Sequence, residues 1–396
     1  MGGHHVLDSS VIRSISAWAG GWAGGGAMTS FYLDVDGRRS PRWADVERRA
    51  GHLLRLARQR AHALDQLEAG SASSVEADLA EIEWWLGREL DRSKVRGVAL
   101  FSCAAKGLFE GLLLPVPVRD QVVVGLEPDV AQLCLLSSGS WHAIAIGVDR
   151  ERWRMVRLAD GGEDEEVDVV DDRLPHRIDV DNELAGFGHH EEELVREHYR
   201  RVARSLEEEL RRRAGARVVL CGPEESVREL EAFLPERVRA QVEGRAHLEL
   251  DAGGAELARC AREVLDAADA GRRSARVAEL RGRVATGDGA VAGIDACLAV
   301  LGAGQAESLL VERTFEMPGG RCVGCGLLIT ATAGPCPRCG GHVRPVVNVV
   351  DAAVGDAYLH DVALVVLAGG ELGDLGRIGA LVAAWARAEG LEPSRA

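Results

Sequence analysis

Four cysteines near the carboxyl end of the chain have the spacing of a metal site. Cys322 and Cys325 form one C-x-x-C pair, and Cys336 and Cys339 form a second pair further along the chain. In such a pair the chain turns so that both sulfurs face one ion, and four thiolates complete the tetrahedral coordination of Zn²⁺. No position then remains for a catalytic water, so the sequence predicts one structural zinc ion in a lobe at 318–345. A redox pair of C-x-x-C motifs and a rubredoxin-type iron site are the alternatives.

A second candidate site lies in the middle of the sequence. The segment 171–190 ends in Gly186, Phe187, Gly188, His189 and His190, and we expect it to be an irregular loop before a helix over 191–213. A glycine-rich loop before a helix can bind an anion. The three glutamates at 191–193 would repel a phosphate there and already complement the helix dipole. We therefore interpret the segment as a flexible loop with His190 near the start of the helix. A loop that docks on a partner and a His/Glu metal site are the alternatives, and His189 and His190 are the obvious general-base candidates.

Composition limits the classes of protein to which the chain can belong. It has 396 residues, 46% of them hydrophobic and 28% charged, which is ordinary for a globular protein. No apolar run is long enough to span a membrane. The formal net charge of −15 argues against simple nonspecific binding to nucleic acid, although a local basic face remains compatible with it. The five other cysteines are scattered along the chain, which fits a reducing cytoplasm better than a disulfide framework.

The periodicity of apolar residues predicts an α/β protein of three domains. The first domain, 28–138, contains a strand at 31–35, two long helices, and then three strands and a short helix. The second, 139–284, begins with a hairpin of two strands, at 141–148 and 152–158. The further elements expected in it are an acidic solvated edge at 163–172, the helix over 191–213, a strand at 216–221, a helix at 224–234, a strand at 247–250 and a long helix at 255–283.

The third domain, 285–396, contains the cysteine lobe. We expect a helix at 291–301 and a strand at 308–312 before the lobe. After the lobe we expect a helix at 348–360, a strand at 362–367 and a helix at 376–386. The first 27 residues are glycine-rich and lack the basic and apolar regions of a signal peptide, so we predict that 1–27 is disordered. A start at Met28 is an alternative to one at Met1.

Several segments, taken in order, resemble the archaeal and eukaryotic class-one peptide release factors and their relative Pelota. The resemblance is closest to the bacterial release-factor-like families, covers about 30–390 and is strongest from Trp141 onward. The segments that carry it in the middle domain are 142–158, 198–203 and 218–222. Those in the third domain are 291–301, 305–311 and 376–381. Archaeal members of the family carry a cysteine zinc lobe in this same domain.

The resemblance implies a fold and a place of action. It implies an RNase-H-like middle domain, a ribosomal-protein-like α/β third domain with a zinc-ribbon insertion, and binding near the ribosomal A site. The implied partners are the ribosome with its A-site and P-site RNA and a translational GTPase, and neither a membrane nor DNA is expected.

Two departures from the family pattern argue against an ordinary termination factor. Catalysis in the family depends on a Gly-Gly-Gln loop, but the matching loop here, 171–190, contains no glutamine. The motifs that read stop codons are also not recognisable in 30–136. The favoured hypothesis is a cytoplasmic, ribosome-associated factor that acts in hibernation, rescue or quality control without that chemistry. The alternatives are a peptidyl-tRNA hydrolase that uses His189 or His190, and a zinc-ribbon adaptor that contacts other proteins.

Overall fold

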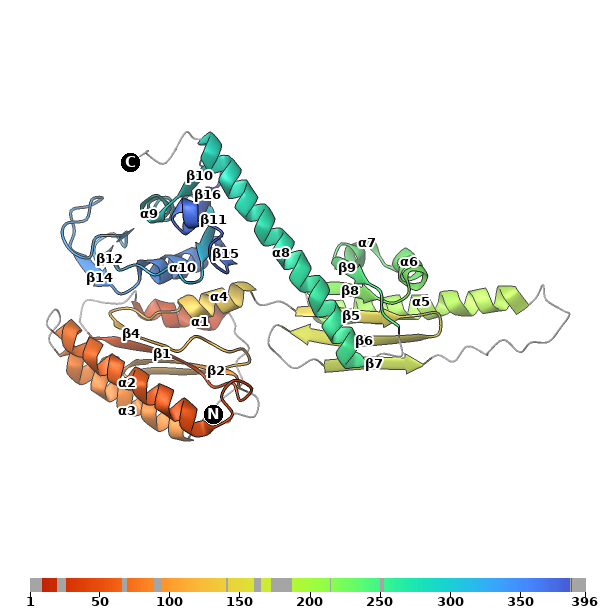
Figure 1. Cartoon of the computed structure of the whole chain (residues 1–396), viewed down its shortest axis with the longest axis horizontal. Coiled ribbons are helices and arrows are strands. Elements are labelled where there is room, and N and C mark those ends of the chain that lie inside the picture. Colours follow the sequence, from red (N-terminus) through yellow and green to blue (C-terminus); the bar gives the residue numbers. More distant parts are fainter. Residues whose placement is uncertain are drawn as a thin grey trace. The chain divides into compact units, whose positions relative to one another are not determined.

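The computed structural model describes most of the chain, and the chain folds into two compact units (Figure 1). The described residues are 9–19, 26–65, 70–88, 95–139, 142–159, 165–171, 187–213, 215–249, 253–384 and 386. The first unit combines residues 1–139 with 275–396, and the second comprises 140–274. The predicted first and third domains therefore fold together as one unit. The mixed α/β class predicted from the sequence is confirmed.

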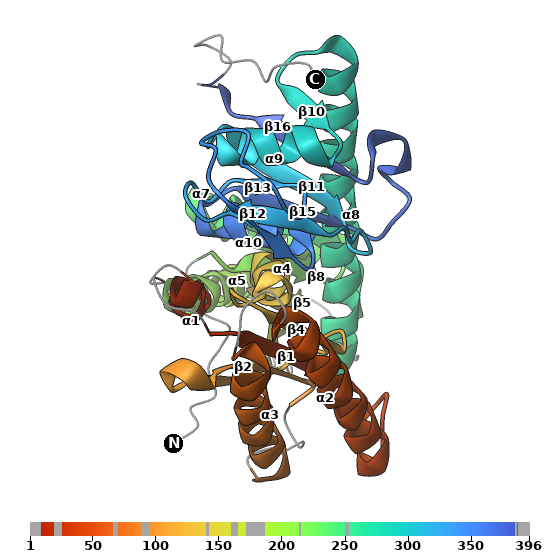
Figure 2. The same cartoon turned by 90° about the vertical axis from the view of Figure 1, so that its left-hand side faces the viewer.

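An antiparallel sheet forms the amino-terminal layer of the first unit. Its strand order is β3-β2-β1-β4, with the strands β1 (Met28–Asp34), β2 (Gly97–Cys103), β3 (Leu108–Leu114) and β4 (Gln121–Gly125). The helices α2 (Trp43–Asp65) and α3 (Ser71–Arg88) lie side by side on one face, as Figure 2 shows. Their apolar stripes pack with Phe31, Leu33 and other buried residues of the sheet, and the two long helices predicted here are confirmed.

The opposite face of this sheet is covered by α4 (Ala131–Gly139) and by a helix from the amino terminus, α1 (Ser9–Ser16). Ile12 and Ile15 of α1 are buried in a core that also contains residues of α4 and of the sheet. The prediction that 1–27 is disordered is therefore wrong for residues 9–19, where α1 and a short 3-10 turn, Ala17–Ala19, form. A helix of eight residues has little stability by itself, and it forms here because tertiary packing buries its two isoleucines.

A second sheet forms the carboxyl-terminal layer of the same unit, with strand order β10-β16-β11-β15. These strands are β10 (Ala290–Ala292), β11 (Ala306–Glu312), β15 (Ala363–Leu367) and β16 (Ile378–Val382). The helices α9 (Ile294–Gly302) and α10 (Val349–Leu359) belong to the same core as the first sheet. Leu280, from the last turns of α8 (Gly254–Thr286), packs with buried leucines of the second sheet.

Two elements of this layer differ from the prediction. The helix expected over 376–386 is the strand β16, preceded by a short 3-10 turn, Gly373–Leu375. All five residues of β16 are buried, so the strand reads as a continuous apolar run, and such a run cannot be told from a buried helix by periodicity. The helix expected over 291–301 begins only at Ile294, because the residues before Gly293 pair with β16.

An acidic pair lies where α4 and α10 meet the first sheet. Asp129, in the connection from β4 to α4, accepts a hydrogen bond from Gln121 on β4 at 3.2 Å. Its backbone carbonyl accepts one from the hydroxyl of Tyr32 at 2.6 Å. Burial, and next the nearby carboxylate of Asp351 on α10, raise the pKa of Asp129 to about 7. The structure therefore favours the protonated form of this carboxyl group more than the unfolded chain does.

We predict that this unit becomes less stable as the pH rises from about 4 to about 7. The native carboxyl group of Asp129 binds a proton more tightly than the unfolded one, so the stabilisation is complete at low pH and is lost as the pH passes its raised pKa. Asp129→Asn should remove part of this dependence and raise stability by about 1 kcal/mol at alkaline pH. Urea unfolding across this pH range tests it, with the exposed Asp266→Asn as control. Equal pH dependence in the Asp129 and Asp266 variants would contradict the assignment.

The second unit is built on one mixed sheet of order β7-β6-β5-β8-β9. Its strands are β5 (His142–Val148), β6 (Arg152–Ala159), β7 (Glu165–Asp171), β8 (Arg217–Cys221) and β9 (Val242–Ala246). Strands β5, β6 and β7 are antiparallel neighbours, whereas β8 and β9 run parallel to β5. The predicted hairpin of β5 and β6 is confirmed.

Helices cover both faces of this sheet. The helices α5 (Phe187–Arg212), α6 (Glu224–Phe233) and α7 (Glu236–Arg239) contribute to a core with Trp153 on one face. The first turns of α8 pack on the other face, through Leu257 and Leu265. In the described part of the chain, no helix is long and apolar enough to cross a membrane.

Two strands of this sheet differ from the elements predicted from the sequence. The strand expected at 247–250 lies earlier, as β9, because the ladder with β8 pairs Val218 with Val242 and ends at Ala246. The acidic stretch predicted as a solvated edge contains the edge strand β7. Only one of its sides pairs with a neighbour, so a charged sequence is compatible with strand formation there.

Candidate metal centre

The four cysteines of the predicted site meet in space. Their sulfur atoms all lie within 4.8 Å of one another. The Sγ atoms of Cys322 and Cys339 are 3.5 Å apart, and those of Cys325 and Cys336 are 3.6 Å apart. Four sulfurs bound tetrahedrally to zinc at about 2.3 Å are separated by about 3.8 Å. The sulfur cluster therefore fits a single tetrahedral ion, and these residues can hold one.

The two cysteine pairs lie in turns that have the same hydrogen-bond pattern. The carbonyl of Cys322 accepts a hydrogen bond from the N–H of Gly326, and that of Cys336 accepts one from the N–H of Gly340, both at 2.9 Å. Gly326 and Gly340 have φ angles of 74° and 72°. This left-handed conformation is open to glycine at little cost, which explains the glycine after each C-x-x-C pair.

A small sheet carries the two turns. Its strands are β12 (Gly319–Cys322), β13 (Leu328–Ile329) and β14 (Val343–Val346), in the order β13-β12-β14. We call the region from Gly319 to Val346 the cysteine lobe. Its separate apolar cluster contains only three buried residues, and two of these are cysteines. A core of this size cannot hold a fold by itself, so we predict that an ion held by the four cysteines supplies much of the stability of the lobe.

The electrostatics of the cluster also favour a cation. The pKa of Cys322 is lowered to about 6, chiefly because the backbone N–H of Cys325 donates a hydrogen bond to its sulfur. For Cys339 the backbone N–H of Gly341 lowers the pKa, but the thiols of Cys322 and Cys325 raise it by more, to about 12. One thiolate thus forms readily and opposes the ionisation of the next. A divalent cation removes this conflict, because metal binding stabilises all the thiolates together.

Gly341 allows the sulfurs to approach closely. A methyl group at this position would lie 3.2 Å from the Sγ of Cys339 and 3.3 Å from that of Cys322. At Gly324 the corresponding distances are 3.6 and 3.9 Å, which are ordinary contacts. The sequence does not reveal this difference, because Gly324 and Gly341 both lie beside or between the cysteines along the chain.

We predict that Gly341→Ala weakens zinc binding about tenfold, whereas Gly324→Ala leaves it nearly unchanged. The added methyl group at position 341 must displace two of the four ligand sulfurs, and misplaced ligands lower metal affinity. Competition with a chromophoric zinc chelator measures both variants. Equal affinities of the two variants would show that the packing of Gly341 against the sulfurs has no role.

The lobe is fixed to the rest of the first unit by Arg321, which directly precedes the first cysteine. Its guanidinium donates two hydrogen bonds to the carboxylate of Asp356 on α10, both at 2.9 Å. Its Nε also lies 2.9 Å from a carboxylate oxygen of Glu127, in the connection from β4 to α4. Burial raises the pKa of Glu127, although the charge of Arg321 opposes this. One arginine thus joins the cysteine lobe to both layers of the unit.

Two further contacts fix the sides of the lobe. The hydroxyl of Thr330 donates to Asp295 on α9 at 2.7 Å, and Arg338 donates to the carbonyl of Gly302 at 2.9 Å. Leu328 of β13 is buried in the large core of the unit. The lobe is therefore held by polar contacts at its margin and by a single apolar strand beneath it.

The second predicted site is only partly described. Gly186 lies outside the described residues, as do 172–185. Phe187, Gly188, His189 and His190 form the first turn of α5, which begins at Phe187 and therefore earlier than predicted. The three glutamates consequently lie beyond the first turn, and His190 is inside the helix instead of at its start. These residues belong to the second unit, and the cysteines belong to the first.

The middle of the chain is similar to a known protein family. Residues 128–285 match the model of "Bacterial archaeo-eukaryotic release factor family 10". This segment of the chain is therefore similar to bacterial release-factor-like proteins. The resemblance inferred from the sequence is thereby confirmed. A search of curated proteins gives no match.

Solved structures of release-factor-like proteins are similar to this chain at low identity. An archaeal translation termination factor, aRF1, is 15% identical, with 94% of this chain and 96% of that chain covered and a TM-score of 0.26. Pelota from Archaeoglobus fulgidus is 14% identical, with 72% and 78% covered and a TM-score of 0.32. Dom34 from S. cerevisiae, described as a termination-like factor that interacts with Hbs1, is 11% identical, with 72% and 79% covered and a TM-score of 0.38.

Proposed function

We propose that this protein is a ribosome-associated, release-factor-like translation factor that binds near the A site in hibernation, rescue or quality control. The observation that carries the proposal is the family match over 128–285, which spans the whole second unit. The ribosome with its A-site and P-site RNA is then the principal partner, a translational GTPase is a further one, and the cytoplasm is the place of action.

The topology of the second unit supports its proposed role as the RNase-H-like domain of such a factor. Three antiparallel strands in sequence order, β5 to β7, are extended on the other side of β5 by the parallel strands β8 and β9. This order, with helices on both faces, is the arrangement of RNase-H-like sheets. The segment 171–190 connects the edge strand β7 to α5, so in this proposal it is the loop directed toward the acceptor end of a tRNA.

We propose further that the factor acts without peptide release of the Gly-Gly-Gln type. The segment 171–190 contains no glutamine, and the six glutamines of the chain all lie elsewhere. In this proposal the loop residues 186–190 make contacts with a partner and perform no chemistry. The cysteine lobe contributes a structural zinc ion, since four thiolate ligands leave no open coordination position.

Two measurements test the proposal. The protein is expected to co-sediment with ribosomes from stationary-phase cells, and to release no peptide from purified peptidyl-tRNA–ribosome complexes. Absence from the ribosomal fraction would favour the adaptor hypothesis. Peptide release by the wild type that is lost in both His189→Ala and His190→Ala, but kept in the exposed His247→Ala of the same unit, would show a peptidyl-tRNA hydrolase instead.

A further inference from the structure

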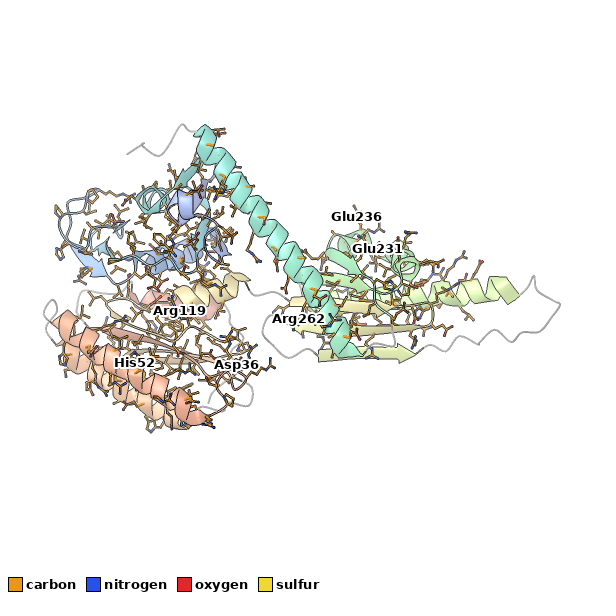
Figure 3. All side chains as sticks on the ribbon, viewed as in Figure 1. Asp36, His52, Arg119, Glu231, Glu236 and Arg262 are labelled. Carbon is orange, nitrogen blue, oxygen red and sulfur yellow. The ribbon has the colours of Figure 1, made fainter. Side chains whose placement is uncertain are left out.

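Two cysteines of the second unit share one apolar core, between its sheet and the first turns of α8. Cys221 ends β8 and is fully buried, and Cys260 lies on α8 and is partly buried. Figure 3 labels Arg262, which follows Cys260 on the same helix. The remaining cysteines outside the metal cluster belong to the first unit, and they are Cys103, Cys134 and Cys297. Cys221 and Cys260 are thus the two thiols of the second unit.

The packing of α8 on β9 brings these two side chains together. Val264 of α8 lies against Gly244 of β9, because a methyl group added to that glycine would be 2.5 Å from the valine Cγ1. A short connection joins β9 to α8, so the helix runs back along the strand. One helical turn before Val264 and two strand residues after Gly244 are each a step of about 6 Å, and they lead to Cys260 and Ala246. Ala246 is the ladder partner of Cys221, so Cys260 lies over Cys221.

The surroundings of Cys221 leave room for a second sulfur. Its neighbours in the ladder are Gly147 on β5 and Ala246 on β9, which have the smallest side chains. Burial raises the pKa of the Cys221 thiol, and the charge of Cys260 and a hydrogen bond between the two side chains raise it further. The two thiols therefore interact directly. Cys221 stays protonated, and Cys260, at the margin of the core, is the one that solvent reaches.

We propose that Cys221 and Cys260 form a reversible disulfide on exposure to a peroxide. In the first step the Cys260 thiolate attacks one oxygen of hydrogen peroxide, so that an S–O bond forms, the O–O bond breaks, and the departing hydroxide takes up a proton as water. In the second step the sulfur of Cys221 attacks the sulfenic acid of Cys260. The S–S bond forms, the S–O bond breaks, and hydroxide leaves with the thiol proton as water. The two thiols together lose two electrons and two protons, and the peroxide is reduced to two molecules of water.

The disulfide joins the first turns of α8 to an inner strand of the sheet. It closes a loop that contains α6, α7 and the edge strand β9, and such a closure stabilises mainly by restricting the unfolded chain. α8 also continues into the first unit, where Leu280 is buried. Oxidation therefore fixes the start of the helix that connects the two units. Disulfides in the cytosol are usually transient and redox-sensing, which is the role inferred for this pair.

The test uses full-length, zinc-loaded protein that is treated with a small excess of hydrogen peroxide, blocked with an alkylating reagent and digested without a reductant. Mass spectrometry should find the peptide of Cys221 linked to the peptide of Cys260, and dithiothreitol should separate them. The amides of 257–265 and of β9 should exchange with solvent about tenfold more slowly in the oxidised protein. Cys221→Ala removes the resolving thiol, so Cys260 should remain a sulfenic acid that dimedone traps, and exchange should not slow.

The matched control is Cys103→Ala, which removes a buried thiol from the first unit and should still form the link. Oxidation of Cys260 to a sulfinic acid without a link to Cys221 in the wild type would overturn the inference. A link from Cys260 to a cysteine of the metal cluster, or an unmodified Cys260 after the same treatment, would overturn it as well. None of these results depends on ribosome binding, so this inference and the proposed function stand or fail separately.

Discussion

Replacement of Cys336 by serine is expected to lower zinc affinity at least 100-fold and to unfold the cysteine lobe. The variant leaves three thiolates, so the tetrahedral site is incomplete. The lobe then has only its three-residue apolar cluster, from which one cysteine has also been changed. Structural zinc contributes about 10–16 kcal/mol of apparent binding free energy in small finger peptides, which far exceeds what such a cluster supplies.

Metal content and hydrogen exchange measure this effect together. Wild-type protein should contain one zinc per chain and protect the amides of β12 and β14 from exchange, and Cys336→Ser should lose both properties. Cys260→Ser is the matched control, because it removes a partly buried thiol of α8, which is not one of the four clustered cysteines. Retention of one tightly bound zinc by the Cys336 variant would refute the four-cysteine site.

The metal site was predictable because its signal is local. The two C-x-x-C pairs and the glycines that follow them, Gly326 and Gly340, specify turns whose geometry depends on a few consecutive residues. The partner of Arg321 was not predictable in this way. Asp356 is distant from it in sequence, and the two meet only through the packing of α10 beside β12.

The errors in secondary structure have the same physical origin. β16 is buried all along its length, so its sequence lacks the alternation that marks a half-exposed strand. β9 and β7 are the edges of their sheet and carry charged residues, so their apolar signal is weak. α1 depends on a core made by residues far along the chain. In each case tertiary contacts determine the structure. A short stretch of sequence does not show which tertiary contacts will form.

The hypothesis that the segment 171–190 has a functional role is not tested by the structure. The histidines at 189 and 190 are candidate bases because they end a glycine-containing segment, and the structure places them within the first turn of α5. Helix geometry fixes their backbone, but the segment before them lies outside the described residues. Their role therefore stays a prediction that the peptide-release assay decides.

Arg321→Ala is expected to destabilise the first unit by about 2–3 kcal/mol without removing the zinc ligands. The substitution leaves the carboxylates of Asp356 and Glu127 without their cation, and breaking a fully buried pair of this kind costs about 3–5 kcal/mol. Their side chains are 28% and 29% exposed, so water moderates the penalty. Because Arg321 contacts both α10 and the β4–α4 connection, the loss should loosen the packing between the two layers as well as the lobe.

The pH dependence of this variant identifies the mechanism. Burial raises the pKa of Glu127 above its ordinary value even beside Arg321, and removal of the guanidinium must raise it further. The variant can then protonate Glu127 at low pH and avoid an unpaired charge, so its destabilisation should be smaller at acidic pH and grow as the pH rises. Urea unfolding of zinc-loaded protein measures this, with Arg338→Ala, whose side chain donates to the carbonyl of Gly302 at the margin of the lobe, as the matched control. The two variants could instead lose the same stability, with no dependence on pH. Arg321 would then act only as one more surface contact, and not as the charge that joins the cysteine lobe to both layers.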